Sequence, residues 1–118
     1  MLADQLKGAV LLFEFNRTYT LPILPLKNTV VFPYSTLPIS VARPASIAAV
    51  DEALSAENKM IAVFTQRDPE KDIPRAEDLY SVGTSAIIKL ITRSDSMIQL
   101  IIQAIERIEI TAVSYTHL

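Results

Sequence analysis

The sequence VGTSAIIKLITRSDSMIQLIIQAIERIEI, residues 82–110, decides the fold class. Two long runs rich in β-branched residues, Val82–Arg93 and Met97–Ile110, flank the polar tripeptide Ser94–Ser96. Runs of this composition with a short polar connection are typical of two antiparallel strands and their turn. The last third of the chain therefore predicts a long β-hairpin.

Upstream of this hairpin, four prolines between residues 22 and 38 separate short apolar runs. Proline cannot donate a hydrogen bond to a sheet ladder, so we expect short, bent strands here rather than one flat central sheet. The runs that we interpret as strands are 23–24, 30–32 and 37–41.

One helix is predicted over residues 44–57. Pro44 suits the first helical position because its ring fixes φ near the helical value. Ile47, Val50 and Leu54 follow on one face, and acidic residues lie mostly off that stripe. The pattern indicates a helix that covers one side of a sheet.

Three other segments complete the organisation. The run MIAVF at 60–64 predicts a buried strand, and the charged, proline-broken segment 67–80 predicts a long loop with one helical turn near its end. Residues 1–20 suit an edge strand and a short helix equally well. The chain is thus expected to form one domain that is mainly β, with one or two helices.

The composition restricts the classes of function. Thirteen acidic and eleven basic residues give a formal net charge of −2, whereas nucleic-acid-binding domains usually carry a basic face. The absence of cysteine excludes disulfides, thiolate metal sites and cysteine nucleophiles. The apolar run Ala9–Phe13 is shorter than a signal peptide or a membrane span requires. We therefore expect a cytoplasmic protein with neither a membrane nor a nucleic-acid partner.

Catalytic chemistry is also disfavoured. The only glycines, Gly8 and Gly83, cannot build a phosphate-binding loop, and the only histidine, His117, is the penultimate residue. Glu106 and Glu109 lie on opposite faces of a strand, so they cannot act as a facing carboxylate pair. We expect no catalytic, metal-ligating or cofactor-binding residue, and hence no cofactor.

Apolar side chains near turns are the remaining candidates for a site. Pro33, Tyr34 and Leu37 crowd a proline-flanked loop, and Met97 lies at the hairpin tip. Exposed apolar residues on a rigid β scaffold are typical of sites for extended peptides or partner proteins. We predict these four as substrate-binding residues. In the alternative interpretation Phe32 and Leu37 are core residues and Met97 is an incidental tip residue.

A set of short motifs extends over residues 21–110, namely LPILPLKNTVVFP at 21–33, Pro38-Ile39, Arg43 before the helix, Ser46-Ile47, VGT at 82–84 and Glu106-Arg107. Together these motifs resemble the N-terminal substrate-binding domain of Lon proteases. The resemblance implies a PUA-like β-barrel with a covering helix, which engages unfolded or tagged protein substrates and helps a hexamer to assemble. The ATPase and peptidase modules of that family have no counterpart here.

The two ends depart from the family pattern. Residues 1–20 are an unmatched lead-in, and the tail TAVSYTHL at 111–118 shows no family motif. Its last five letters resemble read-through of a sequencing adapter, so we interpret the chain as a truncated fragment whose tail is an artefact. The missing strands are expected to leave an unpaired barrel edge that favours self-association.

These observations favour a protein- or peptide-binding domain of an ATP-dependent Lon protease. The alternatives are a stand-alone adaptor built on this domain and, because PUA-like folds serve RNA elsewhere, an RNA-binding module. The balanced charge and few aromatic residues disfavour RNA.

The purified chain is predicted neither to hydrolyse ATP nor to cleave casein, because it has no phosphate-binding loop and no nucleophile paired with a base. Phosphate release and a fluorescent casein assay measure the two activities. Turnover above buffer in a contaminant-free preparation would contradict this prediction.

Overall fold

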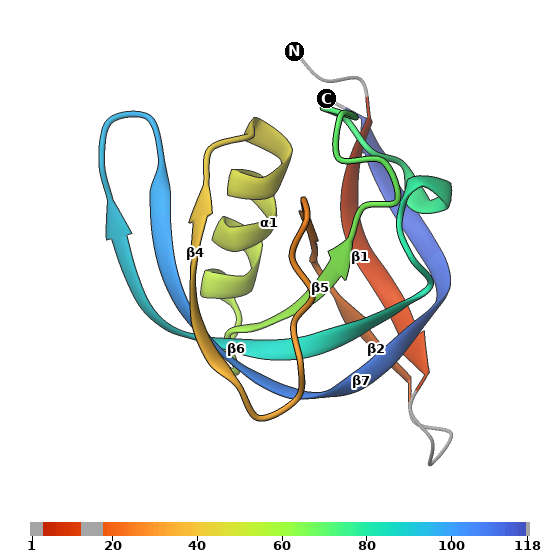
Figure 1. Ribbon diagram of the computed structural model, residues 1–118, viewed down its shortest axis with the longest axis horizontal. Helices are drawn as coiled ribbons and strands as arrows, with labels where there is room; N and C mark the ends of the chain where they lie inside the picture. The colour runs from red at the N-terminus through yellow and green to blue at the C-terminus, as the bar shows by residue number, and fades with distance from the viewer. Residues whose placement is uncertain (1–3, 13–17, 118) are drawn as a thin grey trace.

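The computed structural model describes the backbone of residues 4–12 and 18–117 and the side chains of residues 20–110. Strands dominate it, with one α-helix and one short 3₁₀ turn (Figure 1). The elements in chain order are β1 (Asp4–Leu12), β2 (Thr18–Leu21), β3 (Ile23–Leu26), β4 (Thr36–Val41), α1 (Pro44–Ser55), β5 (Met60–Thr65), η1 (Ala76–Asp78), β6 (Val82–Arg93) and β7 (Ile98–His117).

The predicted hairpin is confirmed as β6 and β7, whose antiparallel pairing runs from Arg93 opposite Ile98 to Val82 opposite Glu109. β7 is longer than predicted, and its second edge pairs with two further strands. Residues 98–103 of β7 pair with β4, and residues 109–117 pair with β1. The tail segment 111–117 thus continues β7.

The barrel closes at Pro22. The strands follow the order β2-β1-β7-β6-β5-β3, and Pro22 is the single residue between β2 and β3. β2 pairs with β1, whereas β3 runs parallel to β5. The Pro22 carbonyl accepts a 2.9 Å hydrogen bond from the Ala62 amide, so the chain changes partner without leaving a backbone acceptor unpaired. The expected mainly-β barrel with a helix is confirmed.

Two short-strand predictions are confirmed and one is wrong. Strands cover 23–24 and 37–41, but the run 30–32 is irregular. The carbonyl of Val31 bonds to side chains rather than to a neighbouring strand, which explains why no ladder forms there. At the N-terminus, residues 4–12 form β1, which decides between the two alternatives in favour of a strand.

Helix α1 begins at Pro44, as predicted. It contacts β3 and β5. Val50 is fully buried, but Ile47 and Leu54, the other members of the predicted stripe, are only half-buried. Small residues let the helix approach the strands closely, so the centre of its contact lies one residue away from the predicted stripe. The residues buried beside Val50 are Ser46, Ala49 and Ala53.

Two hydrophobic clusters fill the interior. The larger lies beneath α1 and β4, and the smaller lies where β3 and β5 approach β7. Within the described residues no helix is long and apolar enough to cross a membrane. Large members of the first cluster are Leu24, Val50, Ile61, Leu100 and Ile102, and those of the second are Ile23, Phe64, Leu79 and Ile108.

Residue 83 in β6 must be a glycine, because β5 lies too close to leave room for a Cβ atom. A Cβ at this position would lie 2.3 Å from the Val63 carbonyl oxygen and 2.5 Å from the Phe64 ring. Real Cβ atoms essentially never come so close to other heavy atoms, and the Val63 oxygen belongs to paired backbone that cannot move freely.

Gly83→Ala is predicted to lower the free energy of unfolding by about 1–3 kcal/mol, because the added methyl overpacks the β5–β6 contact. Urea denaturation followed by circular dichroism measures this change. Ser81→Ala, at an exposed neighbouring position, is the control and should stay within about 0.5 kcal/mol. Equal effects of the two substitutions would contradict the prediction.

Candidate functional site

The segment Lys27–Ser35, here called the 27–35 loop, connects β3 to β4 and is fixed along its length. The Thr65 hydroxyl donates a hydrogen bond to the Thr29 carbonyl. Near the loop's end, the Tyr34 amide donates to the Ala104 carbonyl at 3.1 Å, and the Ala104 amide donates to the Ser35 carbonyl at 2.8 Å. The loop is therefore held to β5 and β7 by backbone acceptors and donors.

The middle of the loop is held at the Val31 carbonyl. Thr84 Oγ1 donates to it at 2.8 Å and Arg107 Nη1 at 3.3 Å. A carbonyl oxygen has two lone pairs, so it can accept both bonds. Thr84 and the Val31 side chain are buried, which makes this junction a fixed internal point rather than a surface contact.

Side chains on either side of buried Val31 point outward. The exposed fractions of Val30, Phe32 and Tyr34 are 56%, 60% and 87%. Tyr34 has a φ of 67°, a left-handed conformation that is uncommon for residues other than glycine. The Arg107 guanidinium lies 5.2 Å from the centre of the Phe32 ring, within the range of a cation–π contact. Apolar surface is thus presented by a backbone with little freedom to move.

The sequence-predicted site residues are only partly brought together. Tyr34 is the most exposed large apolar residue among the described side chains, and Pro33 beside it is half-buried. Leu37 packs against the larger hydrophobic cluster. Met97 lies at the hairpin tip, at the far end of the β4–β7 ladder. Six residues of β7, 98–103, lie between it and Ala104, the partner of Tyr34, which corresponds to roughly 20 Å along the strand.

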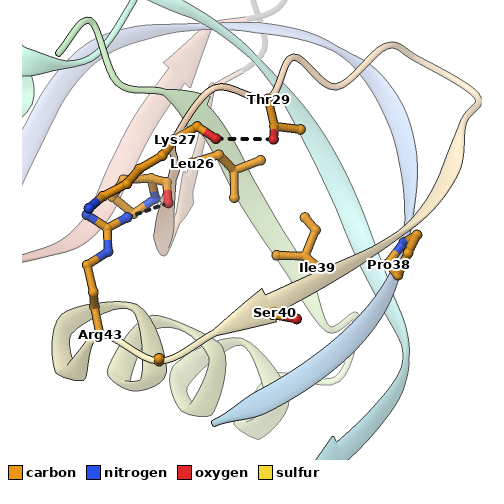
Figure 2. Close-up of a pocket in the computed structure, with 9 residues that line it drawn as sticks. Leu26, Lys27, Thr29, Pro38, Ile39, Ser40 and Arg43 are labelled. Carbon is orange, nitrogen blue, oxygen red and sulfur yellow. Dashed lines mark hydrogen bonds between the residues drawn. The ribbon is translucent and has the colours of Figure 1, made fainter. Parts of the chain in front are cut away.

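A cavity of about 380 Å³ lies between β3 and β4 (Figure 2). One wall consists of Pro25–Lys27 and Thr29, and the other consists of Pro38–Ser40, Ala42 and Arg43. A second cavity of about 230 Å³ lies between Met97 at the hairpin tip and Ile47 on α1.

Arg43, in the wall of the first cavity, donates hydrogen bonds to three other segments of the chain. Its guanidinium donates to Gln66 Oε1 at 2.6 Å, to the Pro25 carbonyl at 2.9 Å and to the Asp72 carbonyl at 3.4 Å. Partial burial lowers the pKa of the Arg43 guanidinium, and the negative charge of Asp72 opposes that shift. Gln66 Nε2 donates to the carbonyls of Asp68 and Lys71, which fixes the adjoining loop.

Within the part of the chain that the structure describes, no three histidine, aspartate or glutamate side chains lie close enough together to hold a metal ion. Glu106 is half-buried and Glu109 is exposed, which is consistent with opposite faces of β7. The arrangement offers apolar contact and backbone hydrogen bonds.

The sequence model of the ATP-dependent protease La (LON) substrate-binding domain matches residues 20–117. The chain belongs to this family. The Lon protease of Nitrosococcus oceani is 57% identical over 94 residues, which are 80% of this chain and 12% of that protein. Lon protease 1 of Thermus thermophilus is 48% identical over 88 residues, which are 74% and 11% of the two chains. The chain therefore spans about an eighth of the length of these curated relatives.

A solved structure has the same fold. It is the N-terminal domain of Mycobacterium avium complex Lon protease, with a TM-score of 0.61 and 21% sequence identity. The match covers 83% of this chain and 54% of that one.

The geometry explains why three of the Lon-family motifs contain the residues that they do. The motifs VVFP, VGT and Glu106-Arg107 are far apart in the sequence, but they meet at the Val31 carbonyl. Thr84 is the last residue of VGT, and Arg107 follows Glu106 on the opposite strand face. These motifs hold the 27–35 loop of the Lon domain in one conformation.

The sequence does not predict two residues of this surface. It predicts a strand at Val30, and it does not predict that Arg107 contacts Phe32. The alternative interpretation, in which Phe32 and Leu37 belong to the core, is wrong for Phe32 and agrees with the packing of Leu37. A usable signal existed for Arg107. As a strand neighbour of Glu106 it points to the other face, so it needs a partner elsewhere or water.

Thr84→Val is predicted to lower the free energy of unfolding by about 1–3 kcal/mol, because the buried Val31 carbonyl loses its shorter hydrogen bond while the side-chain volume is kept. Urea denaturation measures this change. Thr36→Val, the same substitution at an exposed position of β4, should stay within about 0.5 kcal/mol. A Thr84→Val protein as stable as the Thr36→Val protein would show that the junction does not hold the loop.

Proposed function

We propose that this Lon domain binds unfolded polypeptide through the apolar side chains of its 27–35 loop. The observation that carries the proposal is the exposure of Val30, Phe32 and Tyr34 on a loop whose backbone is fixed by hydrogen bonds. Unfolded chains expose apolar side chains that folded proteins bury, so apolar contact can distinguish the two states.

Rigidity of the loop supports binding. A surface that is already ordered does not lose conformational entropy when a ligand arrives, so more of the contact free energy contributes to affinity. Tyr34 also keeps a backbone conformation that is costly for a non-glycine residue, and strain of this kind concentrates at functional sites. The cation–π contact from Arg107 restrains the Phe32 ring while much of its surface stays accessible.

The residues predicted from the sequence take different parts in the proposal. Pro33 and Tyr34 belong to the contact surface itself. Leu37 supports the surface from the core below it. Met97 would contact the same substrate only as a second, separate point near the hairpin tip, so a bound segment would have to span roughly 20 Å to reach both.

The context of the domain is part of the same proposal. The relatives are named Lon proteases, and we propose that the parent protein is a cytoplasmic, ATP-dependent serine endopeptidase in which this domain recognises substrates. Self-association into a hexamer would place several weak sites near one substrate and raise the overall affinity through effective concentration. A stand-alone adaptor would use the same surface without the enzymatic modules.

The isolated domain is predicted to bind reduced, carboxymethylated lactalbumin with a dissociation constant on the order of tens of micromolar or weaker, because few apolar contacts contribute. The triple variant Val30→Ser/Phe32→Ser/Tyr34→Ser should bind at least about tenfold more weakly. Affinity should change little between 50 and 300 mM salt, since apolar contact is not screened. Fluorescence anisotropy measures binding, and circular dichroism checks folding.

A matched control removes exposed apolar surface elsewhere. Ile73 and Leu90 are 52% and 66% exposed, and Ile73→Ser/Leu90→Ser should bind like the wild type. Equal losses in the two variants would mean that general surface apolarity is responsible. Strong salt dependence would point instead to an electrostatic function.

A further inference from the structure

Within the described strands, β4 is paired along one edge and unpaired along the other. Among the described strands, β7 is its only partner. The Ala104 amide of β7 donates to the Ser35 carbonyl, so Ser35 and every second residue after it direct their backbone groups to β7. The residues between them, Thr36, Pro38 and Ser40, direct theirs away from β7. Pro38 fits this assignment because a proline is tolerated where no ladder donor is needed.

The unpaired edge lines the 380 Å³ cavity. Pro38, Ile39 and Ser40 form the β4 wall, and β3 with the residues after it forms the facing wall (Figure 2). On the β3 wall Pro25 has no amide hydrogen, and its carbonyl already accepts a bond from Arg43. The β4 edge offers the amides of Thr36 and Ser40 as donors and the carbonyls of Thr36, Pro38 and Ser40 as acceptors. All three residues are exposed.

The charged residues that line this cavity are both cations. Lys27 Nζ lies 3.5 Å from Asp72 Oδ1, and Arg43 donates to the backbone carbonyl of the same aspartate. In Figure 2 the side chains of Lys27 and Arg43 extend from the two walls and meet at one end of the cavity, and Pro38 lies at the other end. One exposed carboxylate beside two cations leaves a local excess of positive charge, in a protein whose net charge is −2. A ligand with a carboxylate is complementary to this side.

We propose that β4 receives an extended segment of unfolded polypeptide as an additional strand. The ligand backbone pairs with the amides and carbonyls of Thr36 and Ser40 and with the carbonyl of Pro38. An acidic side chain of the segment lies beside Lys27 and Arg43. This inference rests on the proposed binding of unfolded polypeptide and adds the recognition of its backbone.

Backbone pairing agrees with the position of the apolar loop. The 27–35 loop leads directly into Thr36, so a segment held by Phe32 or Tyr34 can continue along the β4 edge. Folded proteins already use their backbone groups in their own secondary structure, whereas an extended unfolded chain has them free. Strand addition thus selects unfolded chains and tolerates many sequences.

The first test uses seven-residue peptides of alternating valine and threonine with one aspartate, acetylated and amidated at their ends. Two isomers carry N-methyl groups on alternate amides, one on each edge of the extended peptide. One isomer should bind at least about tenfold more weakly than the unmodified peptide, because it loses the hydrogen bonds to β4, and the other should bind nearly as well. Equal affinity of the two isomers for the wild-type chain would overturn strand addition.

The second test changes the protein. Ser40→Pro removes an outward amide and should weaken peptide binding about tenfold, whereas Ser40→Ala keeps that amide and should bind like the wild type. Lys27→Met should lose about a threefold preference for the aspartate peptide over its asparagine counterpart. Circular dichroism checks that each variant folds. If the Ser40→Pro protein does not fold, the N-methyl isomers still test strand addition on the wild-type chain.

The outcomes separate this inference from the proposed function. Failure of the wild type to bind carboxymethylated lactalbumin would overturn both. Normal lactalbumin binding that depends on Phe32 and Tyr34, together with equal affinity of the two N-methyl isomers, would overturn strand addition alone. A wild-type dimer that Ser40→Pro converts to a monomer without changing peptide affinity would assign the β4 edge to a second copy of the chain, and would also overturn it.

Discussion

The sharing of β7 by three strands is the constraint on which the structure depends. One edge of β7 pairs with β6, while the other pairs first with β4 and later with β1. Between Gln103, the last partner of β4, and Glu109, the first partner of β1, no strand among the described residues pairs with that edge. The 27–35 loop fills this interval, because Ala104 bonds to its backbone and Arg107 reaches the Val31 carbonyl. The position of the loop thus follows from the gap between the β4 and β1 pairings along one edge of β7.

Local patterns were sufficient for most of the fold. The hairpin follows from two β-branched runs around a polar turn, and the helix follows from Pro44 and an apolar stripe. The sequence of 30–32 predicts a strand, because valine and phenylalanine favour strands and nothing in those residues indicates otherwise. What prevents a ladder there is a set of side-chain donors from distant strands, Thr84 and Arg107 among them. Such partners become visible only when the register of the sheet is known.

The same limit applies to the candidate site. Tyr34 could be predicted because it lies between Pro33 and Pro38 in a segment too crowded with apolar residues to bury them all. Its left-handed backbone occurs together with a bond to Ala104, seventy residues away in the sequence, and could not be predicted. Met97 was grouped with Tyr34 because both lie near turns. The β4–β7 register instead places the two at opposite ends of one ladder.

The two recognition elements differ in what they require of a ligand. Apolar contact at the 27–35 loop needs a bulky side chain but tolerates many backbone conformations, whereas pairing at the β4 edge needs an extended backbone but tolerates many side chains. A native protein that exposes one apolar residue satisfies only the first requirement, and a flexible polar tail satisfies only the second. Because the loop runs directly into β4, both requirements fall on the same short segment of ligand. Their conjunction favours an unfolded chain with apolar residues, even though each contact alone is weak.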